Sequence, residues 1–154
     1  MKRTILALAA SVAAVFAVGV GSAAAAAPTL TIQHQVKGCH NWSLNAGPLR
    51  VSQTVHLAKG GSLTITNSDV MPHQLIKLSG APVVMKLTSI GNPSVGMMKA
   101  PYAPGMMAHM SAKLKVSFAK AGTYTFTTKA GEDYMKGVKT VGEDNVLKLK
   151  VIVA

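Results

Sequence analysis

Apolar and polar residues alternate over several short stretches of this chain, as they do in strands that bury one face. The alternating positions are Leu30, Ile32, His34 and Val36; Val51, Val55 and Leu57; Leu63 and Ile65; Leu114, Val116 and Phe118; Tyr124 and Phe126; and Leu147, Leu149, Val151 and Val153. Glycine turns follow at Lys59-Gly60-Gly61 and Lys120-Ala121-Gly122. Many short strands joined by such turns predict an all-β sandwich, with a long loop from Gly91 to Met110.

The first 27 residues have a different pattern. Lys2 and Arg3 precede an uncharged apolar stretch from Ile5 to Val20, and small residues follow it. This pattern predicts a cleaved signal peptide over residues 1–27, with an apolar stretch that is short for a membrane span. We therefore expect one domain, residues 28–154, with no transmembrane segment in the mature chain, located in the periplasm or outside the cell.

The charge of the chain is strongly basic, with 16 Lys and Arg against 5 Asp and Glu and a formal charge of +11. The lysines are scattered, and no aromatic residues are interleaved with them for base stacking, which argues against nucleic-acid binding. A basic face that attracts an acidic protein partner is the interpretation we favour. No paired carboxylates lie among apolar residues and no phosphate-binding glycine loop occurs, so we expect no enzymatic activity.

Cys39 is the single cysteine, which excludes an intramolecular disulfide. In an oxidising compartment such a thiol is buried, bound to a metal, paired with another molecule, or a liability. His40 follows it directly. Side chains of adjacent residues in extended backbone point in opposite directions, so both can bind one metal only if Gly38 permits a turn.

Two stretches carry a family resemblance: Thr66-Asn67-Ser68-Asp69-Val70-Met71-Pro72-His73 and Gly122-Thr123-Tyr124-Thr125-Phe126-Thr127-Thr128. Together with the apolar final strand, they make the chain resemble a cupredoxin, the small Greek-key β-sandwich of plastocyanin and azurin. The resemblance implies that His73 binds copper. It also implies a cysteine, a histidine and a methionine ligand in the last loop, but Thr128 stands at the cysteine position and no histidine follows it.

The same resemblance indicates where replacement ligands lie. In cupredoxins the first and third strands run parallel, so the loop holding Cys39 would emerge at the same end as His73. The strand from Leu114 to Phe118 would start at that end too, directly after a methionine-rich stretch. The resemblance therefore predicts a metal site formed by Cys39, His40, His73, His109 and Met110.

The chemistry of these groups favours copper. Thiolate and thioether suit Cu(I), while imidazole suits both copper oxidation states. Few carboxylates are present for calcium or magnesium, and zinc would gain nothing from the methionines. For His109 and its methionine neighbours, packing over the end of the sandwich remains an alternative.

We therefore expect a secreted or periplasmic copper-binding protein that acts in electron transfer or copper handling, with an acidic redox or copper-transfer protein as a possible partner. A metal-free β-sandwich that binds another protein is the alternative function.

Overall fold

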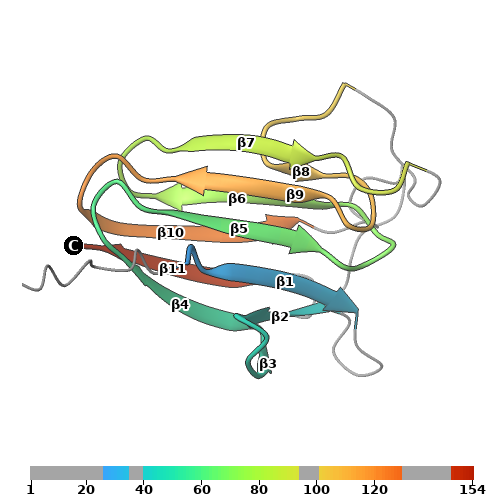
Figure 1. Cartoon of the computed structure of the whole chain (residues 1–154), viewed down its shortest axis with the longest axis horizontal. Helices are drawn as coiled ribbons and strands as arrows, with labels where there is room; N and C mark the ends of the chain where they lie inside the picture. Colours follow the sequence, from blue (N-terminus) through green and yellow to red (C-terminus); the bar gives the residue numbers. More distant parts are fainter. Residues whose placement is uncertain (1–25, 35–39, 94–100, 130–146) are drawn as a thin grey trace, which may run out of the picture.

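The computed structural model describes residues 26–34, 40–93, 101–129 and 147–154, which form two β-sheets (Figure 1). The strands are β1 (Thr29–His34), β2 (His40–Leu44), β3 (Leu49–Arg50), β4 (Ser52–Leu57), β5 (Ser62–Asn67), β6 (His73–Ser79), β7 (Val84–Ser89), β8 (Met106–Met107), β9 (Lys113–Ser117), β10 (Gly122–Lys129) and β11 (Lys148–Val153). One sheet has the order β3-β2-β1-β5-β9-β7, and the other has the order β4-β11-β10-β6-β8.

Both sheets are mixed. Strand β1 is parallel to β5, and β11 is parallel to β4, while the other pairs are antiparallel. The predicted all-β Greek-key sandwich is confirmed, and so is the parallel pairing of the strand that starts the domain with the strand that precedes His73. The described residues include no helix long and apolar enough to cross a membrane. The signal peptide expected over residues 1–27 lies almost wholly outside the described residues and stays a prediction.

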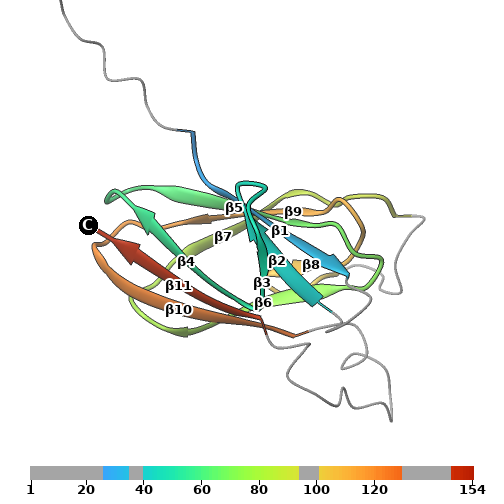
Figure 2. The same cartoon turned by 90° about the horizontal axis from the view of Figure 1, so that it is seen from below.

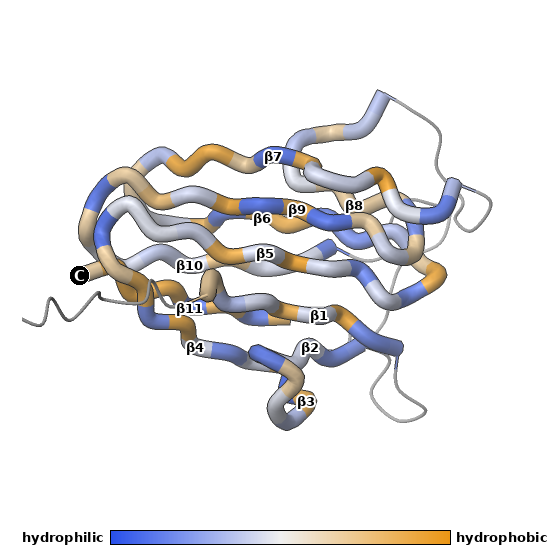
Figure 3. Tube along the Cα trace, viewed as in Figure 1, coloured by the Kyte–Doolittle hydropathy of each residue, from blue (hydrophilic) through white to orange (hydrophobic). Residues whose placement is uncertain are grey.

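The core fills the space between the two layers, which Figure 2 shows from the side. Alternating residues of β5, β9, β10 and β11 are buried, and Figure 3 shows the matching alternation of hydropathy along β5 and β9. Three aromatic rings form its centre, with Phe118 packed edge-to-face against Tyr124 at 4.9 Å and against Phe126 at 6.1 Å between ring centroids. Such aromatic contacts favour a single arrangement of the two layers.

Gly105 sets the approach of β8 to β6. Its φ is +79°, and a Cβ added to it would lie 2.3 Å from the carbonyl oxygen of Leu75. The Gly105 carbonyl accepts a hydrogen bond from the Leu75 N–H at 2.9 Å. Only glycine allows both this left-handed backbone and this close contact, and the contact fixes the strand pair in which Met107 lies opposite His73.

Candidate metal centre

Three segments that are distant in the sequence meet at one end of the sandwich. His34 ends β1 and is the register partner of His40, the first residue of β2. Because β1 and β5 are parallel, with Ile32 opposite Asn67, the connection after β5 emerges at the same end. Both strands point to the right in Figure 1. That connection carries Asp69 and leads into β6 at His73.

Asn67 holds this connection in place. Its side chain is fully buried, and its Nδ2 donates to the carbonyl of Met71 at 2.8 Å and to that of Met107 at 3.2 Å. Its Oδ1 accepts the N–H of Asp69 at 2.9 Å. One amide thus ties the β5–β6 connection to β8 and turns the Asp69 side chain inward.

Asp69 is a buried carboxylate between two imidazoles. Its Oδ2 lies 2.7 Å from Nε2 of His40 and 3.0 Å from Nε2 of His73, and its Oδ1 accepts the N–H of Met71 at 3.3 Å. Burial by itself would raise the pKa of Asp69, but the hydrogen bonds from His40, His73 and Met71, with the charge interaction with His73, outweigh it and hold the pKa far below its usual range. The low pKa means that the carboxylate favours its ionised form between the two imidazoles.

His34, His40 and Asp69 form a group of side chains that could hold a metal ion. His34, His40 and Asp69 each offer one donor atom, and these atoms lie within 4.8 Å of one another. The ring centroids of His34 and His40 are 5.5 Å apart, and those of His40 and His73 are 4.6 Å apart. His40, His73 and Asp69 are buried, whereas His34 is exposed, so the cluster is open to solvent on the side of His34.

The predicted ligands fall in different places. His40 and His73 lie together around Asp69, whereas Nε2 of the buried His109 is hydrogen-bonded to the hydroxyl of Tyr102 at 2.7 Å. Met110 follows His109 and is half-buried, and Cys39 lies outside the described residues. The metal-binding roles of Cys39, His40, His73, His109 and Met110 stay predictions.

The methionines at this end are mostly packing residues. Met106 and Met107 are buried, and Met107 belongs to the hydrophobic core. Met107 is also the register partner of His73 across β6 and β8. The methionine opposite His73 is therefore a residue that the core already uses.

Thr128 occupies the position at which the resemblance called for a cysteine. It is buried, and its hydroxyl accepts the N–H of Leu147 at 3.1 Å. Its own N–H donates to the Leu147 carbonyl at 3.2 Å. These bonds extend the pairing of β10 with β11, which is a structural role for the hydroxyl.

Sequence reasoning did not single out Asp69, and it named His34 only among the alternating positions of the first strand. Asp69 is the only Asp or Glu outside residues 130–146, and it stands two residues after Asn67 between apolar strands. A lone acid in that position was a usable signal. His34 could be identified as a candidate ligand only from its position at the end of a strand, where side chains no longer pack against the core.

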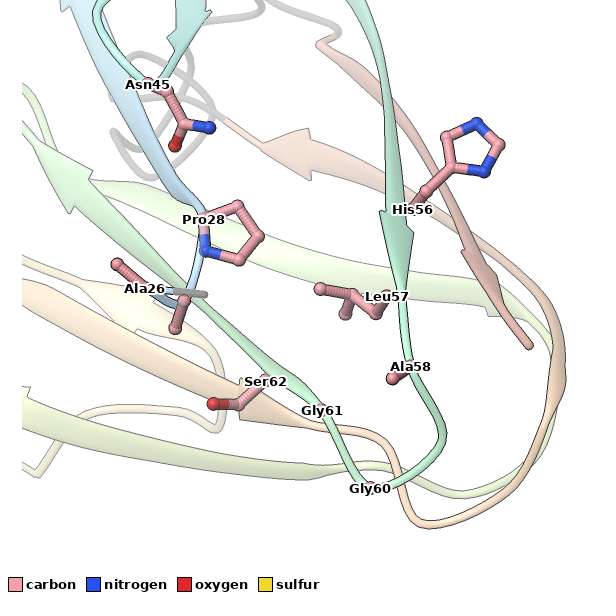
Figure 4. Close-up of a pocket in the computed structure, with 10 residues that line it drawn as sticks. Ala26, Pro28, Asn45, His56, Leu57, Ala58, Gly60, Gly61 and Ser62 are labelled. Carbon is pink, nitrogen blue, oxygen red and sulfur yellow. The ribbon is translucent and has the colours of Figure 1, made fainter. Parts of the chain in front are cut away.

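The sandwich also has an open pocket at its other end (Figure 4). Its lining includes Pro28, Ser62 and the glycines of the Gly60 turn, with His56 at its margin. Because Pro28 precedes β1 and Ser62 begins β5, this pocket lies where those parallel strands start, whereas the histidine cluster lies where they end. The pocket is therefore separate from the candidate metal centre.

The chain matches no family model and no curated protein. It is similar to solved structures of two reduced mutants of amicyanin, at 17% and 16% identity, each with a TM-score of 0.42 and covering 86% of this chain and 87% of that one. A cysteine protease inhibitor from Entamoeba histolytica is similar at 14% identity and a TM-score of 0.40, covering 67% of this chain and 86% of the inhibitor. Likenesses this distant decide nothing about the chemistry of the chain, which has to be argued from its own residues.

Proposed function

We propose that this chain is a secreted or periplasmic copper-binding protein that acts in electron transfer or copper handling and catalyses no reaction. The observation that carries the proposal is the group of His34, His40 and Asp69, whose donor atoms lie within 4.8 Å of one another, with His73 on the same carboxylate.

The chemistry of the group supports a first-row transition metal. Imidazole is a ligand for copper, zinc, iron and nickel, and among divalent ions copper binds most tightly to such nitrogen and oxygen sites. Calcium and magnesium need more oxygen ligands than one carboxylate supplies. The residues present therefore fit copper, and a bound copper ion would supply one-electron chemistry or serve as cargo.

Charge supports an acidic partner. The only Asp or Glu among the described residues is Asp69, and it is buried. The charged side chains on the described surface are therefore all basic, with lysines on both sheets, such as Lys115 on β9 and Lys150 on β11. A surface of one sign attracts a partner of the opposite sign and speeds its association at low salt.

The test is a copper titration of the metal-free protein and two matched histidine variants. His40→Ala removes a buried imidazole from the cluster, whereas His56→Ala removes an exposed one from β4 at the other end of the molecule. We expect the parent and His56→Ala to bind one copper ion, and His40→Ala to bind at least tenfold more weakly.

Circular dichroism of each metal-free variant shows whether the sandwich is intact. A folded His40→Ala protein with the copper affinity of the parent would refute the proposed site. A parent that binds no copper would leave the metal-free interaction module as the function.

A further inference from the structure

The carboxylate at the centre of the cluster bears on which oxidation state of copper the protein holds. We infer that the site is built for Cu(II), with Asp69 Oδ2 and the imidazoles of His34 and His40 as ligands and with His73 as a positioning residue. This inference rests on the proposed copper-binding function and deepens it, because it specifies the oxidation state of the copper that the protein binds.

Donor type is the first argument. A carboxylate oxygen is a hard, anionic donor, and Cu(I) prefers soft thiolates and thioethers. Asp69 is buried, with its Oδ2 facing His40 Nε2 at 2.7 Å and His73 Nε2 at 3.0 Å, and charge is poorly screened in such a place. A buried negative charge stabilises a doubly charged ion more than a singly charged one, so it favours Cu(II) over Cu(I).

Geometry is the second argument. Bonds of about 2.0–2.2 Å from imidazole nitrogen and carboxylate oxygen to a metal place the donors of one ion about 3–4 Å apart. His40 Nε2 is already 2.7 Å from Asp69 Oδ2, and the His34 donor lies within 4.8 Å of both. Only small side-chain movements separate this arrangement from a three-ligand site, and His34 is exposed at the end of β1.

The place of His73 is the third argument. It is fully buried at the start of β6, and its Nε2 faces the same Asp69 oxygen at 3.0 Å. A hydrogen bond to a ligating carboxylate fixes the orientation of that carboxylate, as residues around a metal site commonly do. His73 therefore acts on the ion through Asp69.

Met107 and His109, which the methionine-rich stretch brings to this end, have other contacts. Met107 packs in the hydrophobic core, and Nε2 of His109 is hydrogen-bonded to the hydroxyl of Tyr102. A volume-conserving Met107→Leu change costs little in packing, which makes it a suitable control for a thioether role.

The experiment is a pair of competition titrations, one with a Cu(II) chelator in air and one with a Cu(I) chelator under anaerobic conditions. The parent should hold Cu(II) more tightly than Cu(I). Asp69→Asn should lower the Cu(II) affinity about 10- to 100-fold, as loss of a metal-site residue commonly does, and change the Cu(I) affinity by less than about threefold. Since Asp69 is buried, His34→Gln is the second variant: its exposed strand-end position spares the fold, and it should lower Cu(II) affinity at least about tenfold.

Spectroscopy separates the ligands from the positioning residue. We expect a pale Cu(II) form whose electron paramagnetic resonance spectrum shows nitrogen coupling that decreases in His34→Gln. His73→Gln keeps an N–H donor for Asp69 and should keep the spectrum of the parent, whereas His73→Leu, which lacks the donor, should change it. Met107→Leu should leave both titrations unchanged.

Three results overturn the inference while copper binding stands: tighter binding of Cu(I) than of Cu(II), a Cu(II) affinity that Asp69→Asn and His34→Gln both leave unchanged, or an intense sulfur-to-copper absorption that Cys39→Ser abolishes. Loss of nitrogen coupling in His73→Gln would make His73 a ligand and overturn its positioning role. Absence of binding for either ion in the parent would refute the proposed function itself.

Discussion

Replacing Asn67 by alanine should destabilise the metal-free protein by several kcal/mol. The side chain is fully buried, and its shortest hydrogen bonds, of 2.8 to 3.2 Å, join it to Met71, Met107 and Asp69, with a longer one of 3.4 Å to the His109 carbonyl. The bonds to Met107 and Asp69 are buried, and removing the partner of a buried group costs about 1–3 kcal/mol each. The bond to Met71 is partly exposed, so water can replace it. We therefore expect a loss of about 2–5 kcal/mol, out of a total stability of about 5–15 kcal/mol for a domain of this kind.

Urea denaturation with a metal chelator present measures this loss from the midpoint and slope of unfolding. Asn67→Asp keeps the volume but replaces the amide donor by a carboxylate, so it should be at least as damaging as Asn67→Ala if donation to the two carbonyls matters. Ser79→Ala is the control, because it removes an exposed hydroxyl contact with Thr125 and should change stability by less than about 0.5 kcal/mol.

The same variant also tests how the metal centre is positioned. Since Asn67 orients the segment that carries Asp69, Asn67→Ala should weaken Cu(II) binding even where the protein is still folded. A loss of stability below about 1 kcal/mol, together with unchanged copper affinity, would show that the β5–β6 connection holds its shape without this amide.

Three further predictions concern other residues. Thr128→Ala should leave copper affinity within about twofold of the parent and cost about 1–2 kcal/mol in urea denaturation, because its hydroxyl accepts the Leu147 N–H; a large loss of affinity would place Thr128 at the metal. Gly105→Ala should cost about 2–4 kcal/mol, and Gly60→Ala about 1–2 kcal/mol, because both glycines have φ near +80° but only the Cβ at position 105 meets backbone; equal losses would refute the contact with the Leu75 carbonyl. Because folding lowers the pKa of Asp69, its contribution is present above about pH 4 and is lost as the pH falls, so the stability gap between the parent and Asp69→Asn should narrow below about pH 4 in urea midpoints; a gap independent of pH would contradict an ionised Asp69.

Much of the sandwich could be predicted because strands with one buried face leave a period of two in the sequence. In β9, Leu114 and Val116 are buried between exposed lysines, so the pattern and the structure agree. Strand β7 lies at a sheet edge and alternates only between exposed and half-buried residues. Val84 is 68% exposed, while its neighbour Met85 packs against the core. The run of apolar residues in β7 therefore does not indicate which of its side chains face the core.

The metal centre was less accessible to sequence reasoning. The parallel pairing of β1 with the strand before His73 was foreseen, and it brings His40 and His73 to one end. The position of Asp69 between His40 and His73 was not predicted, because it depends on the register of the strands that carry the two histidines. His34 was not named as a ligand for a related reason: alternation indicates which face of the strand its side chain lies on, but its place opposite His40 comes from the hairpin register.

The parallel pairing of β1 with β5 also has a consequence for the order of events in folding. His34 and His40 belong to one hairpin, but Asp69 lies beyond β5, and only the β1–β5 register joins them. Non-local parallel pairing forms slowly, because the loop-closure entropy is lost before contacts compensate for it. An unfolded chain therefore holds these donors apart, so a metal ion would be bound by all of them only after the sandwich is complete. An ion that binds only the folded state also stabilises that state by mass action. Occupancy of the site would therefore report that the chain has finished folding.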